Sequence, residues 1–494
     1  MTITTDHNRL NTASASEPVR LLGLDFGSTT SSMMLAEVTL SRHSLSGRMT
    51  FSEPIIRQRS EPVFTPFNDD RIDETALAAL LDGWLSECAL SAGQPLASQT
   101  LAGAALVTGL AACSHNAARI SELVRARLGD SLIASADDPQ LESWLAFMGS
   151  CATLSRHLGE RPLLNLDIGG GTTNPALGRN GEVLHCGCYF IGARHLRFAP
   201  GSYRLTGTSE QGRALLHHLQ LPTEPGTELS AQSVIAVCDL LVRGLEAIVA
   251  GEPASLPVLA DLQQVASGPV APEAVVTFSG GVGELIYQHG ASGQWPARTA
   301  FGDLGIDLAQ AILRSPRLSR DLHIRPENAG RATVMGLTLH SCDVSGSSLY
   351  LSDSSRLPLN DIPLIARLAA GASATDWQQA TRLAAAAARS QSGQGSACIA
   401  ISGTGDCDHQ QIRALAEEIR AALEASHYPI NQPLVLLLDS NTGKTLGQYV
   451  TSWGQAPRCL FVIDEIPLRQ ARFARIGQPH QHIVPVSFFG MNQP

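Results

Sequence analysis

Short runs of aliphatic residues along this chain alternate with longer segments in which apolar side chains recur every three or four positions. The run at 20–26 ends in a polar corner and a second apolar run follows at 33–38, which predicts two strands joined by a tight corner. Helical spacing of apolar residues then predicts a helix over 74–90. Strands at 104–107 and 132–135 with helices at 116–128 and 139–158 continue the alternation, which is typical of an α/β fold.

The same strand-and-corner pattern occurs a second time. An aliphatic strand at 162–168 runs into the segment NLDIGGGTTN, and a hairpin turn at Asn180-Gly181 is expected to return the chain. LLGLDFGSTTS and LLNLDIGGGTTN share an aliphatic strand, an aspartate, an apolar residue, a glycine and hydroxyl side chains. Because Asp25 and Asp167 lie 142 residues apart, the repeat indicates a duplication at the scale of a domain.

The remaining pattern divides the chain further. Helices are expected near 208–220 and 230–250, a strand at 274–279 that ends in a glycine turn, helices near 303–314 and 328–341, and a strand at 347–351. A polar connection follows, and 353–494 again alternates helices with strands. We therefore expect a disordered tail at 1–18, a first lobe at 19–160, a second lobe at 161–352 and a C-terminal α/β domain at 353–494.

The composition of the chain limits the kinds of molecule that it is expected to bind. The 494 residues carry a formal net charge of -10 with no long lysine or arginine block, which argues against nucleic acid or an anionic membrane as the main partner. The polar N-terminus has no apolar segment typical of a signal peptide, and no run approaches the roughly 20 apolar residues that cross a bilayer. The ten cysteines form no CxxC pair, so reduced thiols in a cytoplasmic protein are expected.

The two corners suggest a chemistry. A corner that lacks side chains turns several backbone N–H groups toward one point, which makes a cradle for phosphate oxygens. A strand-end aspartate would repel phosphate, but it can hold Mg²⁺ directly or through water. Either corner alone could be an ordinary turn, whereas the two together with a later glycine turn favour nucleotide binding. The expected donors are Gly27, Ser28, Thr29, Thr30, Gly169, Gly170, Gly171, Thr172 and Thr173.

Asp25 and Asp167 are accordingly the candidate catalytic and Mg²⁺-binding residues, clamping a triphosphate from two sides of a cleft. The third glycine turn opens a helix and could let a flat purine lie against the backbone. Its candidate residues are Gly280, Gly281 and Gly283.

These motifs resemble those of the actin, Hsp70 and hexokinase superfamily. DFGST at 25–29 resembles its first phosphate motif, DIGGGT at 167–172 its second, and FSGGV at 278–282 its adenosine motif. The resemblance implies duplicated ribonuclease-H-like, actin/Hsp70-type ATPase lobes that close on Mg-ATP or ADP. Asn174 stands where Hsp70 has a second acid, and Glu142 is the nearest match to a water-orienting acid, so slow hydrolysis is expected.

Longer stretches resemble one branch more closely, the reactivating factors of ethanolamine ammonia-lyase. They include HCGCYFIGARHL, QPLVLLLDSNTGKTLGQY and the ending HIVPVSFFG, so the similarity covers essentially the whole chain. It implies an ATP-dependent, chaperone-like factor that releases damaged cobalamin from ethanolamine ammonia-lyase so that intact adenosylcobalamin can rebind. It leaves open whether identical copies assemble and whether the protein associates with a bacterial microcompartment.

Two other functions stay open on the residues alone. A small-molecule kinase of the same superfamily would phosphorylate a sugar or acyl group, and it would need a general base near the γ-phosphate. An actin-like structural ATPase would have to fit the C-terminal domain around its filament contacts. Gly443-Lys444-Thr445 resembles the end of a Walker A loop, but Leu438 occupies its first glycine position, so an ordinary helix start is expected.

Overall fold

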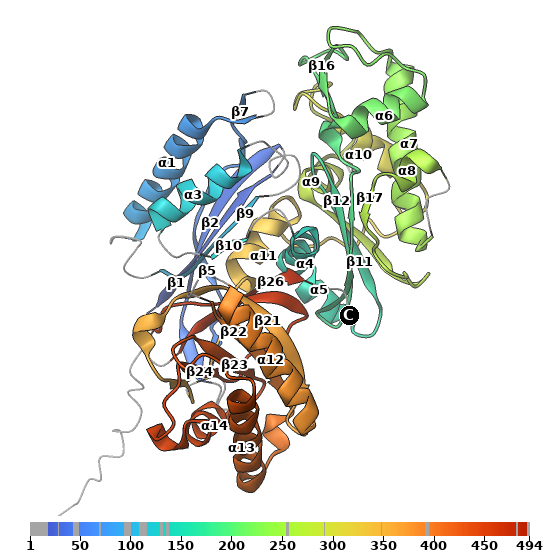
Figure 1. Ribbon diagram of the computed structural model, residues 1–494. Coiled ribbons are helices and arrows are strands. Elements are labelled where there is room, and N and C mark those ends of the chain that lie inside the picture. The colour runs from blue at the N-terminus through green and yellow to red at the C-terminus, as the bar shows by residue number, and fades with distance from the viewer. Residues whose placement is uncertain are drawn as a thin grey trace, which may run out of the picture.

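A computed structural model describes residues 18–27, 29–42, 49–68, 71–92, 100–107, 116–128, 132–134, 138–252, 256–290, 292–346, 348–390, 395–480 and 483–491. Two six-stranded sheets and one eight-stranded sheet, each with helices against it, organise this part of the chain. The first two sheets lie side by side and the third, built by the C-terminal part, lies below them (Figure 1). The predicted α/β class is confirmed, whereas the disordered tail predicted at 1–18 lies almost wholly outside the described residues.

The first sheet is built around the aliphatic strand that opens the chain. Its central strand runs antiparallel to the next strand and parallel to a later one, and nearly all of its side chains are buried. Helices α1 (Glu74–Ala92) and α3 (Ala117–Leu128) cover one face. In order across the sheet, the strands are β10 (Leu132–Ala134), β9 (Thr100–Val107), β1 (Val19–Phe26), β2 (Thr30–Val38) and β5 (Ile55–Arg59), with β6 (Val63–Phe64) also on β2. Two short ribbons, β3 (Leu40–Arg42) with β4 (Met49–Phe51) and β7 (Phe67–Asn68) with β8 (Arg71–Ile72), complete this lobe.

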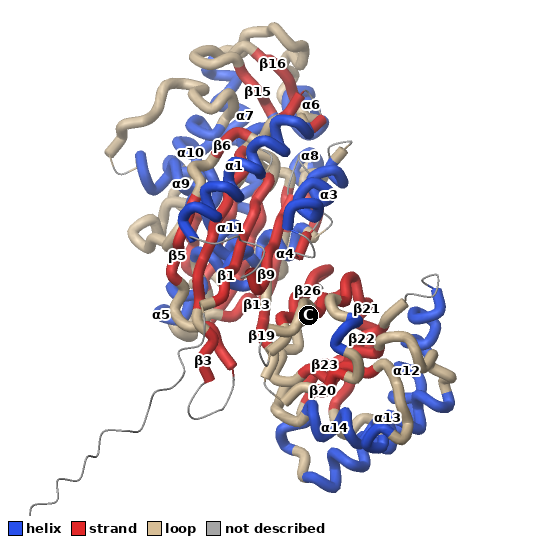
Figure 2. The backbone as a smooth tube through the Cα atoms, turned by 90° about the vertical axis from the view of Figure 1, so that its left-hand side faces the viewer, coloured by secondary structure: helices blue, strands red, loops and turns tan. Residues whose placement is uncertain are grey.

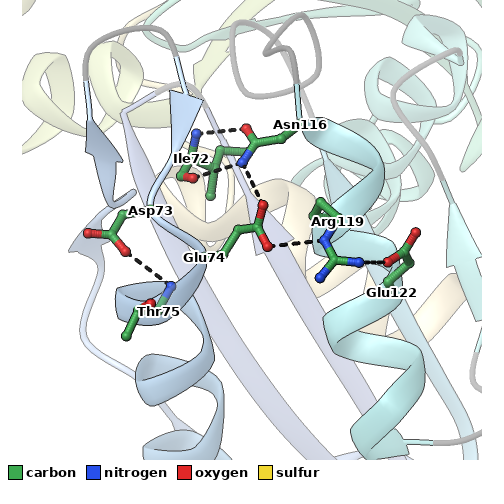
Figure 3. Close-up of polar contacts among 7 residues, drawn as sticks. All are labelled: Ile72, Asp73, Glu74, Thr75, Asn116, Arg119 and Glu122. Carbon is green, nitrogen blue, oxygen red and sulfur yellow. Dashed lines mark hydrogen bonds and ion pairs between the residues drawn. The ribbon is translucent and has the colours of Figure 1, made fainter.

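Figure 3 shows the hydrogen bonds and ion pairs that join the N-terminal ends of α1 and α3. The Asn116 side chain accepts a hydrogen bond from the Ile72 amide at 2.9 Å and donates to the Ile72 carbonyl at 2.9 Å and to Glu74 at 3.2 Å. Arg119 also donates to Glu74, at 3.0 Å, and this bond lowers the pKa of the Glu74 carboxyl. These bonds fix where both helices begin relative to the sheet.

The second sheet repeats the central arrangement of the first. Its central strand runs antiparallel to the following strand and parallel to a later one. In order, the strands are β17 (Gln263–Val265), β14 (Cys188–Tyr189), β12 (Thr173–Arg179), β11 (Leu163–Ile168) and β18 (Val275–Ser279), with β13 (Glu182–Cys186) also on β12. The hairpin predicted at Asn180-Gly181 is confirmed, since both residues have positive φ angles of 52° and 83°.

A largely aliphatic core joins the second sheet to its helices. The helices are α6 (Glu210–His218), α7 (Ala231–Ala250), α8 (Pro257–Ala260), α9 (Gly280–His289) and α10 (Gly305–Arg314), with the ribbon of β15 (Leu196–Phe198) and β16 (Leu205–Thr208) and the short turns η2 (Ala193–His195) and η3 (Ala329–Arg331). Serine hydroxyls cap α6 and α7 at their N-termini, which explains where these predicted helices begin.

The third sheet carries four parallel strands with three helices packed on one face. Figure 2 shows these helices on the outer side of the sheet, away from the first two sheets. The order is β19 (Asp343–Val344), β26 (Pro485–Met491), β25 (Ala471–Ile476), β21 (Leu359–Ala369), β22 (Ala397–Ser402), β23 (Leu434–Leu438), β24 (Leu460–Ile463) and β20 (Tyr350–Leu351). The helices are α12 (Ala374–Ser390), α13 (His409–Ala425) and α14 (Gly443–Val450). Short turns occur in the connections between elements, η4 (Ser354–Arg356) after β20, η5 (Thr404–Asp406) after β22 and η6 (Ser452–Gly454) after α14.

Sequence patterns missed or merged a few elements. The helix predicted over 139–158 is two helices, α4 (Pro139–Ser150) and α5 (Ala152–Leu158), because the chain turns at Cys151. β21 was not predicted, since its half-exposed side chains and internal proline hide the strand pattern. The cysteines that the structure describes are free, and Cys186 and Cys188 lie buried in strands. Among the described residues, no helix is long and apolar enough to span a membrane.

Two helices cross between the first and second sheets at a pair of glycines. α4 packs on the second sheet, where Ser143 bonds to the Pro175 carbonyl, while α11 (Ala332–His340) packs on β1 of the first sheet. A Cβ at Gly149 would lie under 3.0 Å from backbone atoms of α11, and one at Gly336 would lie equally close to the backbone of α4. The two backbones therefore touch, and only glycine allows this crossing.

We predict that Gly336→Ala lowers the free energy of unfolding by about 1–3 kcal/mol, because its methyl group meets the rigid backbone of Leu145. Urea denaturation followed by tryptophan fluorescence measures the change. Gly83→Ala in α1 is the matched control, since nothing lies within 4 Å of the added methyl and the helix gains stability by about 0.5–1 kcal/mol. Equal effects of the two substitutions would show that the crossing is loosely packed.

Candidate functional site

The two glycine corners have the same geometry. In the first, the Gly27 amide donates to the Thr30 carbonyl at 3.0 Å, and in the second the Gly169 amide donates to the Thr172 carbonyl at 2.9 Å. Across the strands, Asp25 lies opposite Ser32 and Asp167 lies opposite Asn174. The two aspartates therefore occupy equivalent positions, one residue before the end of each central strand.

The corners also meet each other. A Cβ at Gly170 would lie under 3.0 Å from the Thr29 hydroxyl, and one at Gly192 would lie under 3.0 Å from the Gly170 carbonyl oxygen. The Arg194 amide donates to that same carbonyl at 2.6 Å. Gly170 is thus held between the first corner and the backbone at 192–194, which explains why a side chain is excluded there.

Asp25 and Asp167 bring two carboxyl groups to this meeting point. Asp167 is 4% exposed and accepts a hydrogen bond from the Ser279 hydroxyl at 2.6 Å, while Asp25 is half-buried. Burial, and then the charge of Asp167, raises the pKa of Asp25 to about 7. Burial raises the pKa of Asp167 to about 6, against the lowering effect of the Ser279 bond. Two ionised carboxylates at this place are costly without a cation.

Three buried oxygens at the corners have no hydrogen-bond partner. They are Asp25 Oδ1, Thr29 Oγ1 and Asn174 Oδ1. A buried polar atom without a partner is expensive, so three of them around one point suggest that a bound group supplies the missing contacts. Mg²⁺ binds carboxylate, hydroxyl and amide oxygens, either directly or through its bound waters. The residues present therefore fit this ion.

The third glycine turn follows β18, which pairs with β11 so that Ser279 lies beside Asp167. The three glycines of the turn differ in their surroundings. Gly280 has a φ of 76° and touches the Ile168 backbone, and Gly283 packs against the Phe278 backbone. Nothing lies within 4 Å of a Cβ at Gly281, which leaves this glycine next to open space. Gly281 is the member of this turn that leaves room for a ligand.

The threonines expected at the two corners also differ, because only some of their hydroxyl groups have hydrogen-bond partners in the protein. Thr173 is buried and donates to the Ile191 carbonyl at 2.7 Å, and the Thr172 hydroxyl accepts a bond from Asn174, so both have protein partners. Thr29 keeps an unpartnered hydroxyl and Thr30 is exposed. Ser28 lies outside the described residues.

Sequence patterns missed the residues that support the corners. Thr65 belongs to no sequence motif, yet its amide donates to the Thr29 carbonyl at 3.0 Å and its hydroxyl to the Gly27 carbonyl at 2.7 Å. In the second lobe, Asn165 donates to the Ser279 hydroxyl at 2.8 Å, which aims that hydroxyl at Asp167. A buried asparagine inside the aliphatic strand 163–168 was the one signal that could have indicated this network.

Arg194 is a positively charged residue at this site that no sequence motif indicated. Its guanidinium lies 3.8 Å from the Asp303 carboxylate and 5.9 Å from the centre of the exposed Phe64 ring in the first lobe. Burial lowers the pKa of Arg194 from its ordinary value, although the group stays charged at neutral pH. A cation whose backbone already binds the second corner therefore reaches toward the first lobe.

Glu142, the candidate water-orienting acid, lies in the first turn of α4. α4 runs along β12, with Ser143 at Pro175 and Phe147 at Gly178, and β12 begins at the second corner. The N-terminal end of α4 is thus the end nearer the corner, which keeps Glu142 a candidate.

This chain is similar to proteins of known structure and to relatives that match it over nearly their full length. An exopolyphosphatase-like protein of known structure covers 66% of this chain and 98% of its own, with 15% identity and a TM-score of 0.40. A relative from Salmonella typhimurium named ethanolamine ammonia-lyase reactivase EutA is 29% identical over 483 residues, which is 94% of this chain and 97% of the relative. The protein of the same name from Escherichia coli K12 is also 29% identical, over 485 residues and the same shares.

A family model covers nearly the whole chain. It is described as ethanolamine utilisation protein EutA and matches residues 17–489. The match includes both corners, the third glycine turn and the C-terminal sheet, and it confirms the family that the sequence motifs indicated. The chain belongs to the EutA family of ethanolamine utilisation proteins.

Proposed function

We propose that this protein binds Mg-ATP or ADP between its two corners and uses it to reactivate adenosylcobalamin-dependent ethanolamine ammonia-lyase. In this reaction damaged cobalamin leaves the lyase and intact cofactor rebinds. The observation that carries the proposal is the meeting of Asp25, Asp167, Thr29 and Gly170 in a chain of the EutA family. Full-length relatives named as ethanolamine ammonia-lyase reactivases support the choice of partner.

The proposed frame is a pair of ribonuclease-H-like lobes of actin/Hsp70 type. It is supported by the two sheets, whose central strands share neighbour order and direction, with one corner at the same place in each. Such corners present backbone N–H groups to phosphate oxygens from opposite sides. The duplicated corners are therefore assigned to the phosphates and the turn at Gly281 to the adenosine.

Each charged residue has a separate role in this proposal. Mg²⁺, when bound, supplies positive charge to the phosphates and to the carboxylates. Asp25 and Asp167 would hold the ion or its waters, and Ser279 keeps the Asp167 carboxylate in place. Arg194 adds a fixed positive charge beside the second corner, where phosphate oxygens gather.

We expect slow ATP hydrolysis because the residue opposite Asp167, Asn174, is uncharged. Asn174 is buried, and an amide cannot accept a proton from water. Hydrolysis therefore relies on Asp25, Asp167 or Glu142 for general-base help, which is consistent with a slow ATPase that acts through its bound states. A chaperone-like factor needs the change between nucleotide states more than it needs turnover.

We predict that Asp25 and Asp167 contribute stability to the ligand-free protein that is lost as the pH rises from about 4 to about 7. The folded-state pKa values of Asp25 and Asp167 lie above their unfolded values, so their stabilising effect is full below about 4 and is lost as the pH passes the raised values. The slope is on the order of 1.4 kcal/mol per pH unit for each proton released. Urea denaturation at several pH values checks it, and the slope should shrink in Asp25→Asn. An unchanged slope in that variant would exclude Asp25 as its source.

We predict that Asp25→Asn and Asp167→Asn raise the stability of the ligand-free protein above neutral pH and weaken Mg-ADP binding by about 10- to 100-fold. Removing one buried charge relieves the repulsion but also removes a metal ligand. Thermal unfolding with and without Mg-ADP, and calorimetric titration, measure both effects. Asp261→Asn, an exposed carboxylate of the second lobe, is the control and should change neither. Normal Mg-ADP affinity in both variants would contradict the assigned site.

We predict that cobalamin-inactivated ethanolamine ammonia-lyase regains activity only when this protein, ATP, Mg²⁺ and fresh adenosylcobalamin are all present. Leaving out each component in turn measures the requirement, and Asp167→Asn should behave like the omission of ATP. Stoichiometric transfer of the γ-phosphate to a sugar or acyl compound, with no recovery of the lyase, would instead identify a kinase.

A further inference from the structure

The carboxyl edge of the third sheet carries a second pair of buried carboxylates. Asp464 and Glu465 directly follow β24, and α14 begins beside them at Gly443, after the adjacent parallel strand β23. Ligands of α/β sheets bind outside the carboxyl ends of parallel strands. This edge lies outside the two corners and has no role in the function proposed above.

Both carboxylates are buried and each has an oxygen without a partner. Asp464 is fully buried and Glu465 is 9% exposed, and neither Asp464 Oδ1 nor Glu465 Oε2 has a hydrogen-bond partner. The hydroxyl oxygen of Thr442, at the start of α14, is also buried and unpartnered. Buried charges are normally paired or bound to a metal, so these atoms require a partner that the described part of the chain does not supply.

The two free oxygens point to one place. A Cβ at Gly346 would lie under 3.0 Å from both Asp464 Oδ1 and Glu465 Oε2, so the oxygens are close neighbours. The Gly346 amide donates to the Asp464 carbonyl at 3.0 Å, which holds this part of the chain across the end of β24. Glu465 has a φ of 57°, a strained angle for a residue with a side chain, and this turns the backbone sharply after Asp464.

A phosphate does not fit this edge, although Gly443-Lys444-Thr445 resembles the end of a Walker A loop. The Gly443 amide, which would have to face a phosphate, donates to Asp464 Oδ2 at 3.2 Å. Lys444 is exposed at the surface of α14. Carboxylates already occupy the position that an anion would take, and they would repel it.

A basic side chain that lines the same cavity as Glu465 already has a carboxylate partner. Arg469 makes two hydrogen bonds of 2.9 Å to Asp343 and lies over the Trp144 ring. Arg469, Asp343 and Glu465 line a cavity of about 700 Å³ that also reaches Leu21 of the first sheet and Gly149 of α4. The cavity gives solutes a route to Glu465.

We propose that Asp464 and Glu465 bind a divalent cation of the Mg²⁺ or Mn²⁺ class, with the Thr442 hydroxyl as a further oxygen ligand. Mg²⁺ is commonly held by one or two carboxylates while it keeps several waters, and the cavity beside Glu465 leaves room for such waters. The ion would tie the end of β24 to the start of α14.

The test measures Mn²⁺ binding to full-length protein that carries Asp25→Asn and Asp167→Asn, so that failure of the nucleotide site does not affect the outcome. Electron paramagnetic resonance of free Mn²⁺ is expected to show one bound ion per chain without nucleotide. Adding Glu465→Gln should weaken this binding by about 10- to 100-fold. Glu327→Gln, an exposed carboxylate of the same cavity, is the matched control and should leave the affinity unchanged.

A second measurement locates the ion. Crystals grown with Mn²⁺ should give an anomalous peak between Asp464 and Glu465, whatever the stability of the Glu465→Gln variant. The proposal is overturned if millimolar Mn²⁺ does not bind to the double variant, if Glu465→Gln binds it normally, or if the anomalous peak lies elsewhere.

Discussion

The close crossing of α4 and α11 is the constraint on which the rest of the structure depends. α4 packs on the second sheet and α11 on the first, so the separation of the two helices sets the separation of the two sheets. Their backbones touch at Gly149 and Gly336, which leaves no room for adjustment by side chains. This contact lets Thr29 of one corner reach Gly170 of the other. A rotation about the crossing would therefore open or close the corners, and a ligand that binds both would favour the closed form.

The packing brings two carboxyl groups together at an electrostatic cost. The crossing and the two strands bring Asp25 and Asp167 together where burial disfavours their charged forms. The protein offsets little of this cost itself: Ser279 bonds to Asp167, while Asp25 Oδ1 has no partner. A ligand that brings positive charge would remove the cost, so binding energy would be gained in the closed form. Binding of a positively charged ligand at the two carboxylates would in this way shift the two sheets toward that form.

The sequence predicted the strands and turns of this site better than the contacts between them. The strand–Asp–Gly corners were recognisable because the strands are largely aliphatic and the glycines interrupt them abruptly. The contact of Thr29 with Gly170 joins residues more than a hundred positions apart, which no local pattern encodes. Thr65 and Arg194 were missed for the same reason, since each supports a corner from a distant segment. β21 was missed because its exposed, proline-containing pattern does not resemble a buried strand.

The C-terminal sheet has its own buried carboxylates, and their position relates them to the crossing. The cavity beside Glu465 is also lined by Gly149 of α4 and by Met335 of α11, so the shape of that cavity depends on the same helix contact that positions the corners. Since Asp464 and Glu465 follow one strand while Asp25 and Asp167 come from two sheets, a cation could bind the first pair without any lobe closing. Movement at the crossing would nevertheless alter the cavity wall. The physical link between the two corners and the C-terminal sheet therefore runs through α4 and α11, where backbone contact transmits a shift that flexible side chains would absorb.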